Sequence, residues 1–152
     1  MRAVRTVALL AASLAFVACQ SKKPETEAPV KTAAPAPTGD KILVGHVASM
    51  TGSEATFGQS TKAGIDMAID EINKKSGVLG RKISVVVEDD RGDAAEARTV
   101  VTKLITKDRV VAVLGEVASK LSLSAAPECQ RNKIPMVTPS STNIEVTQKG
   151  DY

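Results

Sequence analysis

Aromatic residues and histidine are scarce in this chain of 152 residues, which contains two Phe, one Tyr, no Trp and one His. So few rings exclude a stacking platform for bases, and no basic stripe runs along the chain, so nucleic acid is not an expected partner. A single His cannot supply a nucleophile–base pair, and no serine lies in a nucleophile elbow. We therefore expect no enzyme, no cofactor and no metal.

Only two cysteines are present, and the first, Cys19, ends an apolar stretch, Val7–Ala18, that follows Arg2 and Arg5. A charged start followed by a short apolar run is typical of a secretory signal, here residues 1–18, and is too short for a free-standing membrane span. Phe16 to Cys19 resembles a bacterial lipobox, in which the cysteine is lipidated, although Leu is usual where Phe16 stands. An ordinary signal peptide with an accidental cysteine is the alternative.

Residues 19–40 contain four prolines among alanines and charges, and Val30 is their only large apolar residue. This composition cannot bury enough surface to fold, and proline keeps it extended. We expect a disordered tether between a lipid anchor and a globular part. If Cys19 is acylated, Cys129 has no intramolecular disulfide partner, and its helical spacing predicts a small hydrophobic residue in the core.

From residue 41 onward the chain alternates between two hydrophobic periods. Apolar runs typical of buried parallel strands occupy residues 42–47, 82–88, 109–114 and 134–137. Segments of helical spacing or helix-start signals occupy residues 57–75, a stretch opening at Asp93, 119–131 and 143–148. This order predicts an α/β fold, an open parallel sheet with right-handed crossovers and helices on both faces. With only four strands, we expect residues 41–152 to be the first part of a larger molecule; a compact flavodoxin-like domain is the alternative.

Several local features carry more specific expectations. Asp93 is expected to cap its helix with Glu96 as the reciprocal capping-box partner. Pro127 predicts a kink or a restart of helix 119–131. His46, inside an apolar strand, is expected to be a core histidine with its hydrogen bonds satisfied. The buried face of helix 57–75 is expected to contain Ile65, Ala68, Ile69 and Ile72.

Asp89, Asp90 and Asp93 form an acidic group that a metal or a phosphoryl group would suit. The structural interpretation is favoured, because Asp93 serves as a cap and Arg91 neutralises a neighbour. No histidine and no second cluster of acidic residues lie nearby in the sequence.

The hydroxyl-rich stretch 137–142 follows the last predicted strand, and ligands of open parallel sheets bind where strands end and loops lead into helices. Ser119 and Thr142 each follow a strand and precede a helix. Each alone suits a plain N-cap. Two adjacent helix starts facing one crevice suit a small anion such as an amino-acid carboxylate. Neither loop has the glycine density of a nucleotide site.

Residues 42–152 resemble the type 1 periplasmic binding proteins of branched-chain amino-acid ABC transporters, the leucine/isoleucine/valine-binding family. The stretches that carry the resemblance are Thr51-Gly52, Phe57-Gly58, Gly64, Ala68, Glu71-Ile72-Asn73, Gly77–Ile83, Val87–Asp90 and Ile134–Asn143.

The resemblance implies two α/β lobes that close on a ligand, of which residues 41–152 form the first part of the N-terminal lobe. By position, the Ser119 hydroxyl and the Thr142 N–H donate to the ligand carboxylate. The Thr142 hydroxyl and the Ser140 carbonyl take the ammonium group, and Phe57 lines the side-chain pocket. The family's disulfide positions are Gly92 and Ala118 here.

The implied protein is an exported, periplasmic or cell-surface lipoprotein. It is expected to bind an amino acid, with a branched-chain amino acid as the leading candidate, and to deliver it to ABC permease subunits. Its membrane contact is the lipid on Cys19. The alternative within the same fold is a ligand-sensing receptor module that signals, and a third hypothesis is a flavodoxin-like or receiver-type enzyme.

Overall fold

The computed structural model describes residues 41–152. The predicted signal peptide (1–18), the tether (19–40) and the lipidation site Cys19 lie outside the described residues.

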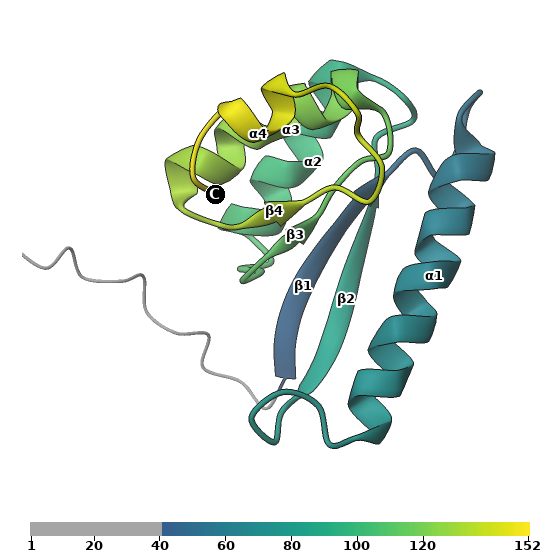
Figure 1. Cartoon of the computed structure of the whole chain (residues 1–152), viewed down its shortest axis with the longest axis vertical. Helices are drawn as coiled ribbons and strands as arrows, with labels where there is room; N and C mark the ends of the chain where they lie inside the picture. Colours follow the sequence, from purple (N-terminus) through teal and green to yellow (C-terminus); the bar gives the residue numbers. More distant parts are fainter. Residues whose placement is uncertain (1–40) are drawn as a thin grey trace, which may run out of the picture. The chain divides into compact units, whose positions relative to one another are not determined.

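The described part of the chain is a parallel sheet with helical crossovers, in the order predicted. Its elements are β1 (Lys41–Ala48), α1 (Ala55–Lys74), β2 (Lys82–Asp89), α2 (Ala94–Thr106), β3 (Val113–Leu114), α3 (Ser119–Asn132), β4 (Met136–Val137) and α4 (Glu145–Gln148). The strands are ordered β2-β1-β3-β4 and every neighbouring pair is parallel (Figure 1). The α/β class and the open parallel sheet are therefore confirmed.

The strands β3 and β4 are shorter than predicted, with two residues each. The apolar run before β3 still follows the sheet, because Val111 N donates to Leu43 O at 2.9 Å and Gly45 N donates to Ala112 O at 2.9 Å. The apolar residues of this run were correctly predicted to lie along the sheet. Regular strand pairing, however, needs a partner strand along the whole run.

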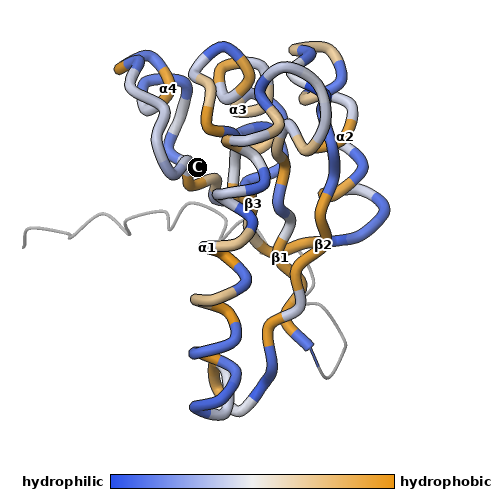
Figure 2. Tube along the Cα trace, turned by 90° about the vertical axis from the view of Figure 1, so that its right-hand side faces the viewer, coloured by the Kyte–Doolittle hydropathy of each residue, from blue (hydrophilic) through white to orange (hydrophobic). Residues whose placement is uncertain are grey.

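Helices cover both faces of the sheet. A Cβ added to Gly45 would lie 2.9 Å from the Leu104 side chain of α2, so alternate residues of β1, including Val47, face α2 and α3. The core lies on that face and comprises Val47, Val100, Val101, Leu104, Val110, Val113, Ala125 and Cys129. Figure 2 shows the hydrophobic stretches of β1 and β2 against which the helices pack.

Cys129 is fully buried in this core, as predicted. Burial, and then the neighbouring Glu128 carboxylate, raise the pKa of its thiol to about 12. The buried face of α2 is likewise as predicted, since Ala97, Val100, Val101 and Leu104 are all buried.

The predicted buried face of α1 is only half covered. Ile65 and Ile69 are partly buried, whereas Ala68 and Ile72 are exposed. The reason is that α1 packs on β1 and β2, the two strands at one side of the sheet. Val137 of β4 shares the α1 face by its register with Leu114 and His46, and its side chain is exposed there.

Two expectations about helix ends and interiors need correction. Asp93 caps α2 through bonds from Ala95 N and Glu96 N, but the reciprocal capping-box bond is absent from residues 41–152 because the Glu96 carboxylate pairs with Arg91 at 3.1 Å. Helix α3 runs through Pro127 without the restart that proline allowed. Leu121 and Cys129 are buried on either side of Pro127, so packing holds both halves of α3 in one helix.

His46 is buried, as expected, but its hydrogen bonds are not satisfied: neither ring nitrogen has a partner among the described residues. The cause is its position on the α1 face, where its cross-strand neighbours are the aliphatic Val87 and Leu114. Burial, reinforced by Lys62 and opposed by Asp66, lowers the pKa of His46 from 6.5 to about 4.

We predict that His46 makes folding sensitive to mild acid. Because the folded-state pKa is lowered, its contribution is complete above the unfolded value of 6.5 and is lost as the pH falls toward 4. A shift of this size corresponds to about 3 kcal/mol at most. Urea unfolding of the full-length protein across this range should show a smaller pH slope for His46→Leu than for wild type; equal slopes would contradict the assignment.

Candidate functional site

All strands are parallel, so the loops that follow β1, β2, β3 and β4 meet at the same edge of the sheet. These loops contain the residues that the sequence pointed to, and they are joined by a dense set of polar contacts.

The structure brings Ser119 and Thr142 together. Thr142 N donates to Ser119 Oγ at 3.1 Å, and Asn143 N donates to the same oxygen at 3.2 Å. Neither residue is an N-cap, because Ala118 occupies that position for α3 and Ile144 for α4. The plain capping interpretation of these two residues was therefore wrong.

The contacts of Ser119 leave its hydroxyl hydrogen available. A serine oxygen has two lone pairs and one hydrogen, and the two backbone N–H groups occupy the lone pairs. Its own O–H must then point to another acceptor. Ser119 opens α3, whose first turn carries no acidic residue, so the helix dipole and the free N–H groups favour a negatively charged acceptor there.

Glu116 lies in the loop after β3. Its backbone carbonyl lies within hydrogen-bonding distance of hydroxyl groups of α3 and of the loop after β4. Thr138 Oγ1 donates to it at 2.6 Å. Ser122 Oγ and Ser141 Oγ lie 3.0 and 3.2 Å from the same carbonyl and 2.7 Å from each other, so one of the two donates to the other and the second donates to the carbonyl. Thr138 Oγ1 in turn accepts from Ser141 N at 3.1 Å. Ser141, for which the sequence predicted no role, thus fastens the loop after β4 to the loop after β3.

Two buried carboxyl groups lie beneath these loops. Asp90 is 0% exposed and Glu116 is 1% exposed. Ser49 joins them, since its N–H donates to Glu116 Oε1 at 2.6 Å and its hydroxyl donates to Asp90 Oδ1 at 2.8 Å. Burial above all raises the pKa of Glu116; the N–H of Ala118 opposes this and the carboxyl group of Asp90 adds to it.

Sequence reasoning missed Glu116 and treated Asp90 as an acid with no second cluster of acidic residues nearby. The two residues are distant along the chain and adjacent in space because β1 and its neighbours end at the same edge. The available signal was an acidic residue directly after the apolar run of β3, where an uncompensated charge is costly.

The other two aspartates have structural partners. Asp89 accepts from Met50 N at 2.8 Å, Thr51 Oγ1 at 2.6 Å and Arg91 N at 2.9 Å. Burial opposes ionisation of Asp89, but these hydrogen bonds outweigh it and lower its pKa. Asp93 caps α2. Within residues 41–152 no group of three or more His, Cys, Asp or Glu side chains is arranged to hold a metal ion.

The remaining predicted site residues, Ser140 and Phe57, are both exposed. Ser140 is exposed in the turn between Thr138 and Ser141. Phe57 lies in the first turn of α1, and 62% of its surface is exposed. The ion pair of Lys120 with Glu54, at 3.2 Å, ties the start of α3 to the start of α1. Lys120 is therefore engaged with α1.

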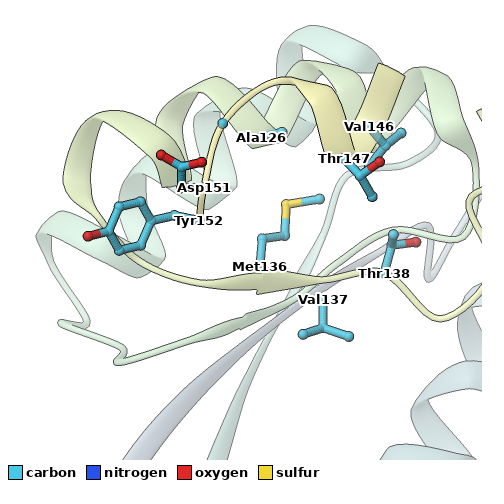
Figure 3. Close-up of a pocket in the computed structure, with 9 residues that line it drawn as sticks. Ala126, Met136, Val137, Thr138, Val146, Thr147, Asp151 and Tyr152 are labelled. Carbon is cyan, nitrogen blue, oxygen red and sulfur yellow. The ribbon is translucent and has the colours of Figure 1, made fainter. Parts of the chain in front are cut away.

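A separate open pocket lies beneath α4, on the side of β4 to which the Met136 side chain points, whereas the Val137 side chain points away from it (Figure 3). Its lining residues are Ala126, Met136, Val137, Thr138, Val146, Thr147, Gly150, Asp151 and Tyr152. Neither Ser119 nor Thr142 lines it, so this pocket is not the predicted ligand site. None of the helices in the described part of the chain is long and apolar enough to span a membrane.

An open parallel sheet with loops converging at its carboxyl edge is the arrangement in which α/β proteins bind ligands. Residues 41–151 match the family described as periplasmic binding protein, and the chain belongs to this family. It is a family of binding proteins rather than enzymes, which excludes the flavodoxin-like and receiver-type alternatives.

Known relatives agree in fold and extend well beyond this chain. The Leu/Ile/Val-binding protein BraC3 of Rhizobium johnstonii is 34% identical over 109 residues, which are 72% of this chain and 29% of that protein. The branched-chain amino acid transporter substrate-binding protein LivJ of Streptococcus pneumoniae, solved with isoleucine, has a TM-score of 0.71 and 34% identity, covering 74% of this chain and 32% of its own.

A third relative was solved with a ligand that is not an amino acid. A solute-binding protein of an ABC transporter from Rhodopseudomonas palustris, solved with 3,4-dihydroxybenzoic acid, has a TM-score of 0.62 and 31% identity, covering 74% of this chain and 30% of its own. The chain thus spans about a third of the length of the proteins it matches.

We predict that Thr138→Val loosens the junction at Glu116. The substitution keeps the shape but removes the donor to the Glu116 carbonyl and the acceptor for Ser141 N, so the free energy of unfolding should fall by about 1–3 kcal/mol in urea titrations. The control is Thr106→Val, whose hydroxyl bonds only within α2 and whose loss should change stability by less than about 0.5 kcal/mol. Equal effects would mean that the junction contributes nothing specific.

Proposed function

We propose that this protein is an extracytoplasmic solute-binding protein that captures an amino acid, branched-chain in the first place, and delivers it to an ABC permease. The observation that carries the proposal is the meeting of the Ser119 hydroxyl with the Thr142 amide at the carboxyl edge of the sheet. The names of the relatives support it, because two of them bind or were solved with branched-chain amino acids.

In this proposal the ligand carboxylate binds between Ser119 and Thr142. The Ser119 hydroxyl donates to one carboxylate oxygen. The Thr142 N–H, which donates to Ser119 Oγ in the free structure, turns to the other oxygen. Binding then exchanges one neutral hydrogen bond for two that are charge-assisted, and such bonds are about twice as strong as neutral ones.

The ammonium group of the ligand lies on the other side of Thr142. Its acceptors are the Thr142 hydroxyl and the Ser140 carbonyl, both in the exposed turn after β4. Phe57, whose side chain is largely uncovered, lines the pocket for the ligand side chain. Binding involves no covalent step, and enclosure of the ligand comes from closure of the protein around it.

Export and anchoring complete the proposal. Residues 1–18 direct secretion, Cys19 carries a lipid, and residues 19–40 tether the binding lobe to a membrane. A single tethered receptor of this kind presents its ligand to a permease in the same membrane or across the periplasm.

We predict that Ser119→Ala weakens amino-acid binding without unfolding the protein. A hydrogen bond to a charged group is worth about 1.5–3 kcal/mol, so affinity for L-leucine should fall about tenfold or more. Thermal shift and calorimetry on the full-length mature protein, with L-leucine, L-isoleucine and L-valine, measure this. Ser60→Ala, an exposed serine of α1, is the matched control and should bind as wild type.

A second ligand separates the two halves of the site. Thr142→Ala should weaken L-leucine but leave 4-methylpentanoate, its analogue without the ammonium group, nearly unaffected. Equal binding by Ser119→Ala and Ser60→Ala would contradict the carboxylate site. A melting shift with hydroxybenzoates and none with amino acids would retain the carboxylate site and overturn the amino-acid assignment.

A further inference from the structure

One of the four carboxyl oxygens of the pair formed by Asp90 and Glu116 has no hydrogen-bond donor. Glu116 Oε1 accepts from Ser49 N at 2.6 Å and Glu116 Oε2 accepts from Ala118 N at 3.2 Å. Asp90 Oδ1 accepts from Ser49 Oγ at 2.8 Å and from Gly92 N at 3.0 Å. Asp90 Oδ2 is buried and has no donor among the described residues.

Two ionised carboxylates in this position would be costly for two reasons. Ser49 Oγ lies 2.8 Å from Asp90 Oδ1 and 3.3 Å from Glu116 Oε1 and both carboxyl groups are buried, so the two negative charges would repel each other in a medium of low polarity. The Asp90 Oδ2 atom would in addition be a buried carboxylate oxygen with no hydrogen bond. One proton removes both costs.

The surrounding charges do not neutralise the pair. On the β2–α2 loop, Asp89 is occupied by Met50, Thr51 and Arg91 N, and the Arg91 guanidinium pairs with Glu96. At the start of α3, Lys120 pairs with Glu54 from the segment before α1. The nearest cations of the adjoining loops are thus engaged with other carboxylates.

We propose that Asp90 and Glu116 hold one proton between them, carried on Asp90 Oδ2 and donated to Glu116, and that they act as positioning residues for the Ser119–Thr142 site. The inference about positioning rests on the proposed function; the inference about the proton does not. Hydrogen bonds assign the proton to Asp90, because each Glu116 oxygen already accepts a backbone N–H.

Glu116 connects the proton to the ligand site through both of its ends. Its side chain holds the N–H of Ala118, the residue directly before Ser119. Its backbone carbonyl holds Thr138 and Ser141, in the loop that ends at Thr142. Loss of the proton leaves two repelling anions under these loops, so the geometry of the Ser119 hydroxyl and the Thr142 amide changes.

The pH dependence has a defined sign. The pKa of Glu116 is raised above 4.5 by burial and by Asp90, so the stabilising protonated state of the pair is complete at acidic pH. It is lost as the pH rises through the raised value. Ligand affinity and stability should therefore decline together at the alkaline side of that transition.

The first test observes the proton directly and needs no ligand. Infrared difference spectra of the full-length protein, wild type minus Asp90→Asn, recorded from acidic to neutral pH, should show the carbonyl stretch of a buried protonated carboxyl group that persists above the pH at which exposed carboxyl groups ionise. Asp70→Asn, a change of an exposed aspartate of α1, should show no such band. Absence of the band from wild type at acidic and neutral pH overturns the proposal, even if every variant is unstable.

The second test uses amides as permanent substitutes for the proton. Asp90→Ala should weaken L-leucine binding about tenfold. Asp90→Asn, whose amide group restores a donor to Glu116, should recover affinity to within about threefold and abolish the alkaline decline. Glu116→Gln should not preserve the affinity for L-leucine, because the amide N–H₂ of the glutamine must face the N–H of Ser49 or Ala118 and two donors would then oppose each other.

The opposite ranking, with Glu116→Gln tolerated and Asp90→Asn as damaging as Asp90→Ala, would overturn the assignment of the proton. If wild type shows the band and the alkaline loss of stability but binds no amino acid, the proposed function fails and the shared proton stands. If it binds L-leucine with no band and no pH dependence, the proposed function stands and the shared proton is wrong.

Discussion

The carbonyl oxygen of Glu116 is the acceptor on which the arrangement of the loops depends. The loops after β3 and β4 are otherwise aligned by strands that pair over only two residues, Val113 with Met136 and Leu114 with Val137. Such a short ladder sets a direction but gives the loops beyond it little restraint. Thr138 donates to this carbonyl, and so does one member of the Ser122–Ser141 pair, whose hydroxyl groups are bonded to each other at 2.7 Å; these contacts supply the restraint.

This junction explains why a stretch of serines and threonines follows β4. Its hydroxyl groups do different work according to where they point. Thr138 and Ser141 are turned inward and hold the backbone, whereas Ser140 and Thr142 remain exposed. A binding site built in this way is organised before the ligand arrives, so less of the interaction free energy is lost in ordering the loops.

The residues around Ser119 and Thr142 also show how acidic side chains can hold loops in place. Asp89, Asp90 and Glu116 together accept hydrogen bonds from the loops after β1, β2 and β3. Carboxylate oxygens are the acceptors that such loops need, because loops leave backbone N–H groups without sheet or helix partners. The cost is buried negative charge, which in the shared-proton proposal is reduced by one proton between Asp90 and Glu116.

Patterns within one element were predicted reliably from the sequence, and relations between elements were not. The strand and helix order, the buried face of α2, the Asp93 cap and the burial of Cys129 follow from local spacing and residue type. The exposure of Ile72 and the unsatisfied nitrogens of His46 depend instead on which strands α1 covers. The Glu96 carboxylate pairs with Arg91 rather than with the backbone N–H of Asp93, and the spacing of these residues in the sequence does not predict which of the two partners is preferred.

The sequence by itself determined an α/β fold with its candidate site residues at the ends of parallel strands, because hydrophobic period and strand–helix order restrict the topology to few solutions. It also placed Ser119 and Thr142 at two adjacent loops. Only the tertiary structure decided that their hydroxyl and amide meet, that Ser141 is a fastener, and that Asp90 lies against Glu116. Those contacts join residues from different loops, and no local preference of the chain encodes them.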